Sequence, residues 1–203
     1  MPNTNFATRL ISALAVVGLS FGLAACGINV KENKNASGDK DVTIQSPVGN
    51  MHVGKDVKGA DTGLTVYPGA KLVEKDDDGG SDRANVNIST PLFGLKLVVV
   101  KYASDDAPQK LVQFYTNELK RYGKVLECNK SGTDADWHIG IDSHDKPNHP
   151  NELSCSGDGK GETVELKVGT NNNARVVAVT PKGKGSEFAL VYVHARSDND
   201  STI

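Results

Sequence analysis

The chain has little of several features that would point directly to a function. Its 203 residues include 23 Lys and Arg against 25 Asp and Glu, so the net charge is only −2. Nucleic-acid binding relies on clustered Lys and Arg, and steering of charged substrates relies on an excess of one sign. The balanced composition therefore argues against a nucleic-acid-binding protein and gives no strong field for a charged substrate.

Common catalytic motifs are missing as well. The sequence contains no Gly-x-Ser-x-Gly for a nucleophilic serine and no His-Glu-x-x-His for zinc. Two Gly-Lys-Gly triplets, at 159–161 and 183–185, lack the longer frame of a phosphate-binding loop. The sequence thus favours a protein that is not an enzyme.

Long apolar runs are rare, and the one at residues 10–23 is the longest. It is shorter than the roughly 20 residues that a membrane-spanning helix needs. Arg9 precedes it, and the small residues Ala24 and Ala25 follow it. This layout predicts that residues 1–25 are a secretory signal peptide.

Leu23, Ala24 and Ala25 directly precede Cys26. These four residues resemble the lipobox of bacterial lipoproteins, in which the cysteine sulfur is lipidated and the signal peptide is cut before it. The resemblance implies an extracytoplasmic protein attached to a bilayer by a covalent lipid on Cys26, with no other cofactor. Gly27, in place of Asp, favours the outer membrane if the cell has two. The alternative is an ordinary signal peptide cut after Ala25, with Cys26 next by chance.

The remainder divides into three segments. Residues 26–40 show neither helical nor strand periodicity and are expected to be the lipidated cysteine and a flexible tether. Residues 41–196 are long enough for a single globular domain, and the polar residues 197–203 are expected to be a disordered tail.

Alternating apolar and polar residues predict many short strands. Two runs flanking residues 46–50 predict a β-hairpin, and the phrase Ile-x-Ser/Thr-Pro recurs at 88–91, before an apolar strand at 95–100. Further strands are expected at 64–67, 84–89, 125–128, 164–168, 176–179 and 188–193. The expected fold is α+β, with a mainly antiparallel sheet built from hairpins.

One principal amphipathic helix is predicted at about 107–122, packed on the sheet. Asp105 and Asp106 suggest an acidic N-cap, Pro108 suits the first turn, and Gly123 suits the end. The expected apolar face consists of Leu111, Tyr115, Leu119 and Tyr122.

Part of the domain resembles a module of uncharacterised bacterial lipoproteins. The similarity lies in Tyr-Pro-Gly-Ala at 67–70, Ser-Asp-Asp at 104–106 and the Phe-Tyr pair at 114–115 before Gly123. It spans about residues 64–128. The resemblance implies an α+β domain and brings no catalytic residue.

Two cysteines remain besides Cys26. In an oxidising compartment, Cys128 and Cys155 are expected to form a disulfide, because a redox pair is usually closer in sequence, as in Cys-x-x-Cys. Between them, His138, His144 and His149 are weak candidates for a metal site, since their spacing matches no standard zinc motif. Exposed histidines on a polar loop are the alternative.

Three functions remain open. The first is a non-enzymatic binding or structural module of the cell envelope, which would contact an envelope protein, peptidoglycan or a polysaccharide. The second is a metal-binding protein or metal-dependent enzyme that uses the histidines of 138–149. The third is a carrier of lipid or another apolar ligand. The absence of catalytic motifs favours the first.

Overall fold

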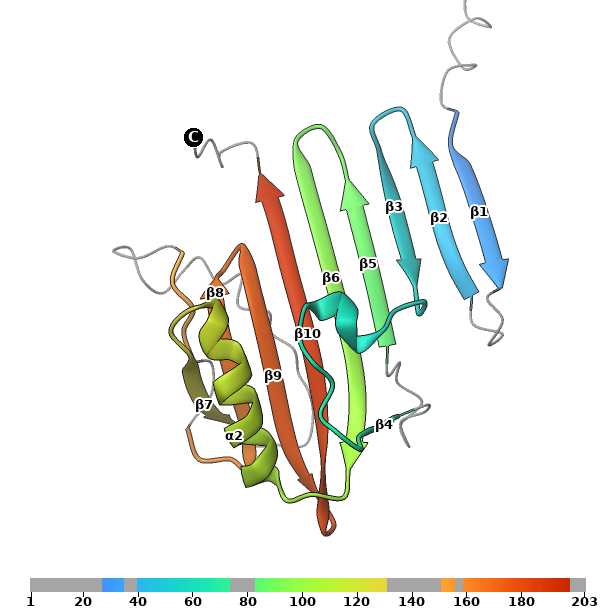
Figure 1. The fold of residues 1–203 in the computed structure, drawn as a ribbon. Coiled ribbons are helices and arrows are strands. Elements are labelled where there is room, and N and C mark those ends of the chain that lie inside the picture. The colour runs from blue at the N-terminus through green and yellow to red at the C-terminus, as the bar shows by residue number, and fades with distance from the viewer. Residues whose placement is uncertain (1–26, 35–39, 74–82, 131–150, 156–158, 198–203) are drawn as a thin grey trace, which may run out of the picture.

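The computed structural model describes residues 27–34, 40–73, 83–130, 151–155 and 159–197. In these residues, ten strands form one open antiparallel sheet, accompanied by one α-helix and two short 3₁₀ helices. The expectation of an α+β fold with a mainly antiparallel sheet is confirmed (Figure 1).

The strands have the following bounds: β1 (Asn29–Lys34), β2 (Lys40–Ser46), β3 (Gly49–Gly54), β4 (Lys71–Leu72), β5 (Arg83–Ser89), β6 (Phe93–Ser104), β7 (Leu126–Lys130), β8 (Thr163–Thr170), β9 (Asn173–Lys182) and β10 (Gly185–Ser197). They lie in the order β1-β2-β3-β5-β6-β10-β9-β8-β7, and the short β4 pairs with β6 outside this path. The α-helix is α2 (Pro108–Leu119), and the 3₁₀ helices are η1 (Gly59–Thr62) and η2 (Lys120–Tyr122).

The sheet has two unlike parts, which Figure 1 shows side by side. We call β6 to β10 with α2 the covered half, because α2 packs on β8 and β9 and η1 packs on β6 and β10. We call β1, β2, β3 and β5 the wing; no helix lies over these strands in Figure 1. The face of the sheet that carries α2 is the helix face, and the opposite one is the back face.

The core of the covered half follows from matching periodicities. Side chains four residues apart on a helix share one face, so Leu111, Tyr115 and Leu119 of α2 are all fully buried against the sheet. Antiparallel register places Leu190 of β10 opposite Val177 of β9 on the same side. Full burial of each such aliphatic side chain contributes about 2–3 kcal/mol.

The ends of the helix differ from expectation. Ala107, and not an aspartate, occupies the N-cap position without a side-chain hydrogen bond, and Pro108 follows it as expected. The Asp106 carboxylate instead accepts hydrogen bonds from Tyr67 Oη (2.9 Å) and Lys110 Nζ (2.6 Å). The α-helix stops at Leu119, the turn η2 follows, and Gly123 ends it with φ 138°. The helix is therefore shorter than the predicted 107–122.

The predicted strand at 64–67 is wrong. This segment has no regular structure and runs antiparallel beside α2, where Leu64 is buried. Its backbone N–H groups bind helix side chains: Thr65 N donates to Glu118 Oε1 (2.9 Å), and Tyr67 N donates to Tyr115 Oη (3.0 Å). Because the donors of alternate residues are satisfied by side chains, the extended segment needs no neighbouring strand.

The predicted tether at 26–40 is also wrong in part, because Asn29–Lys34 form β1. This strand pairs with β2 over its whole length, from Asn29 opposite Gln45 to Lys34 opposite Lys40. All six of its side chains are exposed, so backbone hydrogen bonds and one ion pair, Lys40 to Glu32 at 2.8 Å, hold it in place. Without a buried face, the strand leaves no alternation for sequence analysis to detect.

Candidate functional site

The residues predicted to carry chemistry lie outside the described part of the chain. They are Leu23, Ala24, Ala25 and Cys26 of the lipobox, and His138, His144 and His149 of the metal candidate. Lipidation and metal binding at these positions therefore stay predictions. In the residues that the structure does describe, no group of three or more His, Cys, Asp or Glu could hold a metal ion. Nor is any helix there long and apolar enough to cross a membrane.

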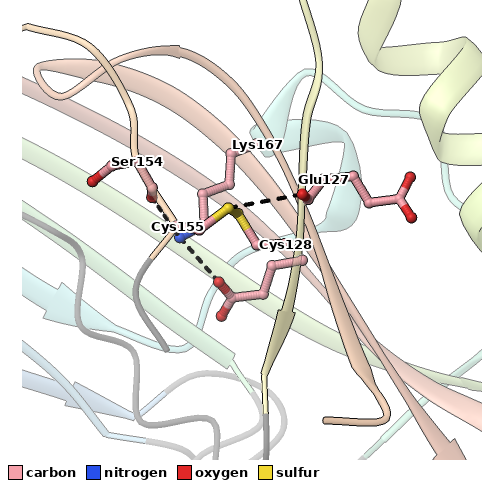
Figure 2. The surroundings of a disulfide bond; sticks show 6 residues. Glu127, Cys128, Ser154, Cys155 and Lys167 are labelled. Carbon is pink, nitrogen blue, oxygen red and sulfur yellow. Dashed lines mark hydrogen bonds and ion pairs between the residues drawn. A yellow bond between two sulfur atoms is a disulfide. The ribbon is translucent and has the colours of Figure 1, made fainter. Parts of the chain in front are cut away.

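The structure pairs Cys128 with Cys155 in a disulfide, with 5.5 Å between their Cα atoms. Cys128 is a buried residue of β7, and Cys155 belongs to the segment 151–155. The Cys155 sulfur also lies 3.7 Å from the Glu127 carbonyl oxygen, as Figure 2 shows. The disulfide thus attaches the segment 151–155 to β7, the outermost strand of the covered half.

An ion pair lies beside the disulfide on the back face of β8. Glu165 is directly opposite Cys128 in the register, and Lys167 follows two residues later on the same side. Their charged groups are 3.0 Å apart and each side chain is only 11% exposed. Lys167 Nζ also reaches the Ser154 carbonyl oxygen at 3.4 Å (Figure 2). The sequence pattern does not reveal this pair, because alternation of Glu165 and Lys167 with Val164, Leu166 and Val168 is equally typical of a strand with one solvent-exposed face.

The surroundings of this pair favour a structural role. Opposite Glu165 and Lys167 on β9 stand Ala178 and Val176, which offer no group for proton transfer. Glu165 Oε2 is buried and forms no hydrogen bond of good geometry among the described residues, although the lysine nitrogen is close. Removing one partner from a buried pair leaves an uncompensated charge and typically costs about 3–5 kcal/mol. The pair therefore constrains β8 and the segment 151–155.

A second polar cluster joins the start of α2 to the segment 64–70. The hydrogen bonds from Lys110 and Tyr67 lower the pKa of the Asp106 carboxyl, and the same aspartate raises the pKa of Lys110. Partial burial, and then the hydrogen bond to Asp106, raise the pKa of Tyr67. Both shifts reflect stabilisation of the charged forms, the carboxylate of Asp106 and the ammonium of Lys110. The cluster acts as a clasp between α2 and the segment 64–70.

The wing presents two faces of opposite chemistry. On the back face, apolar side chains of neighbouring strands stand opposite one another in two rows: Val30–Ile44–Met51–Ile88–Leu95 and Val42–Val53–Val86–Leu97. On the helix face, polar side chains form the corresponding rows: Asn29–Gln45–Asn50–Ser89 and Lys31–Thr43–His52–Asn87–Lys96. Alternation within each strand is the sequence signal for these faces, and their alignment across strands requires the register.

The two hairpins of the wing end in turns that touch. The first joins β2 to β3 through Pro47 and Val48, and the second joins β5 to β6 through Pro91 and Leu92. Because β3 pairs with β5, the turns lie side by side, and a Cβ on Gly49 would stand 2.5 Å from the Ser89 carbonyl oxygen. The glycine thus permits close packing of the two turns.

The described residues thus present an apolar and a polar face on the wing, and they contain no cluster that we assign to catalysis. Comparison with known proteins is a further source of evidence on the role of the chain. No family model, curated protein or solved structure matches this chain.

Proposed function

We propose that this chain is a membrane-anchored extracytoplasmic lipoprotein that serves as a non-enzymatic binding or structural module of the cell envelope. The anchor part of the proposal is supported by the apolar run at 10–23 and by the residues Leu23 to Cys26, which match a lipobox. Gly27 supports the outer membrane where a cell has two. Two or three acyl chains on one cysteine would give lasting attachment, because each buried CH₂ contributes about 0.8 kcal/mol.

The uncovered apolar face of the wing supports the second part of the proposal, that the protein binds a partner. A sheet face in a soluble domain is normally buried when it is apolar, yet no described helix covers the back face of β2, β3 and β5. The side chains there are half-buried at best, and Met51 is 36% exposed. Burial of such a surface drives protein association, so we place an apolar partner surface of an envelope protein on the back face.

The polar face of the wing is the alternative binding surface, and it suits a different class of partner. Its amide side chains, such as Asn50 and Asn87, suit hydrogen bonds to the hydroxyl groups of peptidoglycan or a polysaccharide. Association through this face would bury little apolar surface. We therefore treat a glycan partner as the competing outcome of the test.

Photo-crosslinking in cells would test the proposal. A photoreactive residue is placed at Met51, on the apolar face, or at its neighbour Asn50, which is also exposed, on the polar face. We expect a discrete protein adduct from position 51, none from position 50, and loss of the adduct when Cys26→Ser removes the anchor. An adduct from position 50 alone would favour the glycan partner, and no adduct from either position would contradict the proposal.

A carrier of lipid or another apolar ligand is the second candidate, because the same rows of apolar side chains would accept an acyl chain. Native mass spectrometry of protein extracted from membranes distinguishes the two. A bound lipid in defined ratio, beyond the covalent one, would favour the carrier, and protein with no such ligand would argue against it. The metal-dependent alternative rests on His138, His144 and His149, and metal analysis before and after their triple replacement by Ala would decide it.

A further inference from the structure

Exposed apolar side chains gather at one end of the sheet. Register brings together the start of β1, the β2–β3 turn, the β5–β6 turn and the end of β10: Asn29 is opposite Gln45, Asn50 is opposite Ser89, and Phe93 is opposite Ser197. We call residues 27–30, 44–51, 88–95, 170–173 and 195–197 the anchored end. In the described part of the chain, the large apolar residues that are exposed here are Ile28, Val30, Val48, Met51, Leu92 and Phe93, and only Leu72 lies elsewhere.

The most exposed of these side chains stand on fixed turns. Val48 is 73% exposed and Leu92 is 69% exposed, each directly after a proline. Thr90 Oγ1 donates to the Phe93 carbonyl oxygen and accepts from Phe93 N, both at 2.9 Å, which closes the second turn on itself. Ser46 Oγ donates to the Gly49 carbonyl oxygen at 2.9 Å in the first. The two apolar tips are therefore held side by side and pointed away from the sheet's core.

Charge is distributed unevenly along the strands. The residues of the anchored end include one charged side chain, Arg196. Carboxylates border this set at Glu152, next to the Asn151 that accepts a hydrogen bond from Asn171 N, and at Asp198, the residue after Ser197 in the sequence. Arg196 Nη2 lies 3.3 Å from the Thr90 carbonyl oxygen, beside the second tip. At the other end, the β9–β10 turn carries Lys182 and Lys184, and Lys182 pairs with Glu187. The tips at Val48 and Leu92 could therefore approach hydrocarbon without burying a carboxylate, while Arg196 suits lipid phosphate.

The position of the predicted lipid selects the occupant of this surface. Ile28 is two residues after Cys26, so the two lie at most about 7 Å apart along an extended chain. Because β1 begins at Asn29, hardly any linker separates the lipidated cysteine from the sheet. Figure 1 shows that β1 starts at the same end as both hairpin turns. The acyl chains would therefore hold this end, and no other, against the bilayer.

We propose that the anchored end docks on the bilayer, with the tips at Val48 and Leu92 in the interfacial layer between headgroups and acyl chains. This inference rests on the proposed lipidation of Cys26 and adds the orientation of the domain. The strands then run away from the membrane. Both faces of the wing, including Asn50 and Met51 in β3, lie beyond the tips and stay accessible to partners. Apolar side chains on fixed turns contribute partitioning into this layer in addition to the covalent lipid.

Depth-dependent fluorescence quenching tests this orientation. Val48→Cys and Leu92→Cys each introduce a free thiol for a polarity-sensitive dye, while Cys128 and Cys155 stay oxidised. Lys184→Cys is the matched control, on an exposed turn at the opposite end. The full lipidated protein is reconstituted in vesicles of phosphatidylethanolamine and phosphatidylglycerol, with lipids spin-labelled near the headgroup or with aqueous iodide as quencher.

We expect lipid quenching at positions 48 and 92 to exceed that at 184 by several-fold, and iodide quenching to show the reverse order. Equal iodide access at all three positions would overturn the proposal. Protection from iodide without lipid quenching would overturn it as well, and would indicate a second copy of the chain on the tips. Mass spectrometry of the same sample separates these results from failure of the proposed function: an unmodified Cys26 refutes lipidation, whereas a lipidated Cys26 with exposed tips refutes only the docking.

Discussion

The two parts of the sheet use the same backbone hydrogen bonding and differ in what their side chains do. In the covered half, Val177, Leu190 and Leu119 meet between strands and helix with no exposure. In the wing, Ile44 and Val86 have the same alternation and remain half-buried, because no described helix lies over them. Burial, and not strand pairing, therefore distinguishes the part that stabilises the domain from the part that we propose for binding partners.

The largest expected effect is in the covered half. Leu119→Asp places a carboxylate among fully buried side chains, and an unpaired buried charge costs more than a domain of this size can tolerate. We expect loss of the cooperative thermal transition, measured by circular dichroism. An unchanged melting temperature would show that α2 does not pack as described.

Removal of the disulfide is expected to have the second-largest effect on stability. Replacing Cys128 and Cys155 together by Ala opens a loop with a sequence separation of 27 residues. The chain-entropy model gives a decrease in the free energy of unfolding of about 3–4 kcal/mol. Urea titration of the oxidised, reduced and double-Ala proteins would measure it. Agreement between the reduced and double-Ala proteins is the control, and identical stability of all three would contradict a role for the bond in holding 151–155.

A charge on the wing should have a smaller and more local effect. Ile44→Asp removes one half-buried side chain from an open face, for which we expect about 1 kcal/mol of destabilisation. Hydrogen exchange should become faster in β2 and β3 and stay unchanged in β9 and β10. The matched control is Gln45→Asp on the polar face, which should leave exchange unaltered. Unfolding of the whole domain by Ile44→Asp would mean that the two parts are not separable in stability.

The smallest effect is expected at the clasp of Tyr67 and Asp106. The pKa of Asp106 is lowered in the folded state, so its contribution to stability is present above the unfolded pKa of about 3.9 and is lost as pH falls through the lower folded pKa. Tyr67→Phe should therefore destabilise the protein slightly at pH 7, and the difference from the wild type should narrow in acid.

Tyr122→Phe is the control for this pH dependence. Its hydroxyl donates to the Gly63 carbonyl oxygen, which does not titrate, so its effect should not vary over the same pH range. Thermal melts of both variants from pH 7 down to acid would compare them. Parallel curves for Tyr67→Phe and the wild type at all pH values would contradict the role of the clasp.

Sequence periodicity predicted the strands and the helix that have one apolar face, and missed the strand that has none. The stripe of Leu111, Tyr115 and Leu119 located the helix, and alternation located β5, β8 and the β9–β10 hairpin. β1 escaped prediction because all of its side chains are exposed, so that no face distinguishes it from a tether. The segment 64–67 has an apolar pattern typical of a strand, but side chains of α2 satisfy its backbone.

The contacts within the candidate surfaces could not be predicted from local sequence patterns either. The repeated Ile-x-Ser/Thr-Pro phrase marked two hairpins, yet contact between their tips depends on the pairing of β3 with β5, which no local pattern encodes. The buried pair of Glu165 and Lys167 was hidden for a similar reason, because local alternation does not reveal whether the second face of a strand is covered.

Mass spectrometry of the N-terminal peptide of the protein, isolated from the membrane fraction, tests the lipid anchor. We expect the mature chain to begin at Cys26, this residue to carry a diacylglyceryl group, and Cys26→Ser to release the protein from the membrane. A mature chain with a free thiol at Cys26, or one cut at another position, would contradict the lipid anchor and with it the orientation of the sheet.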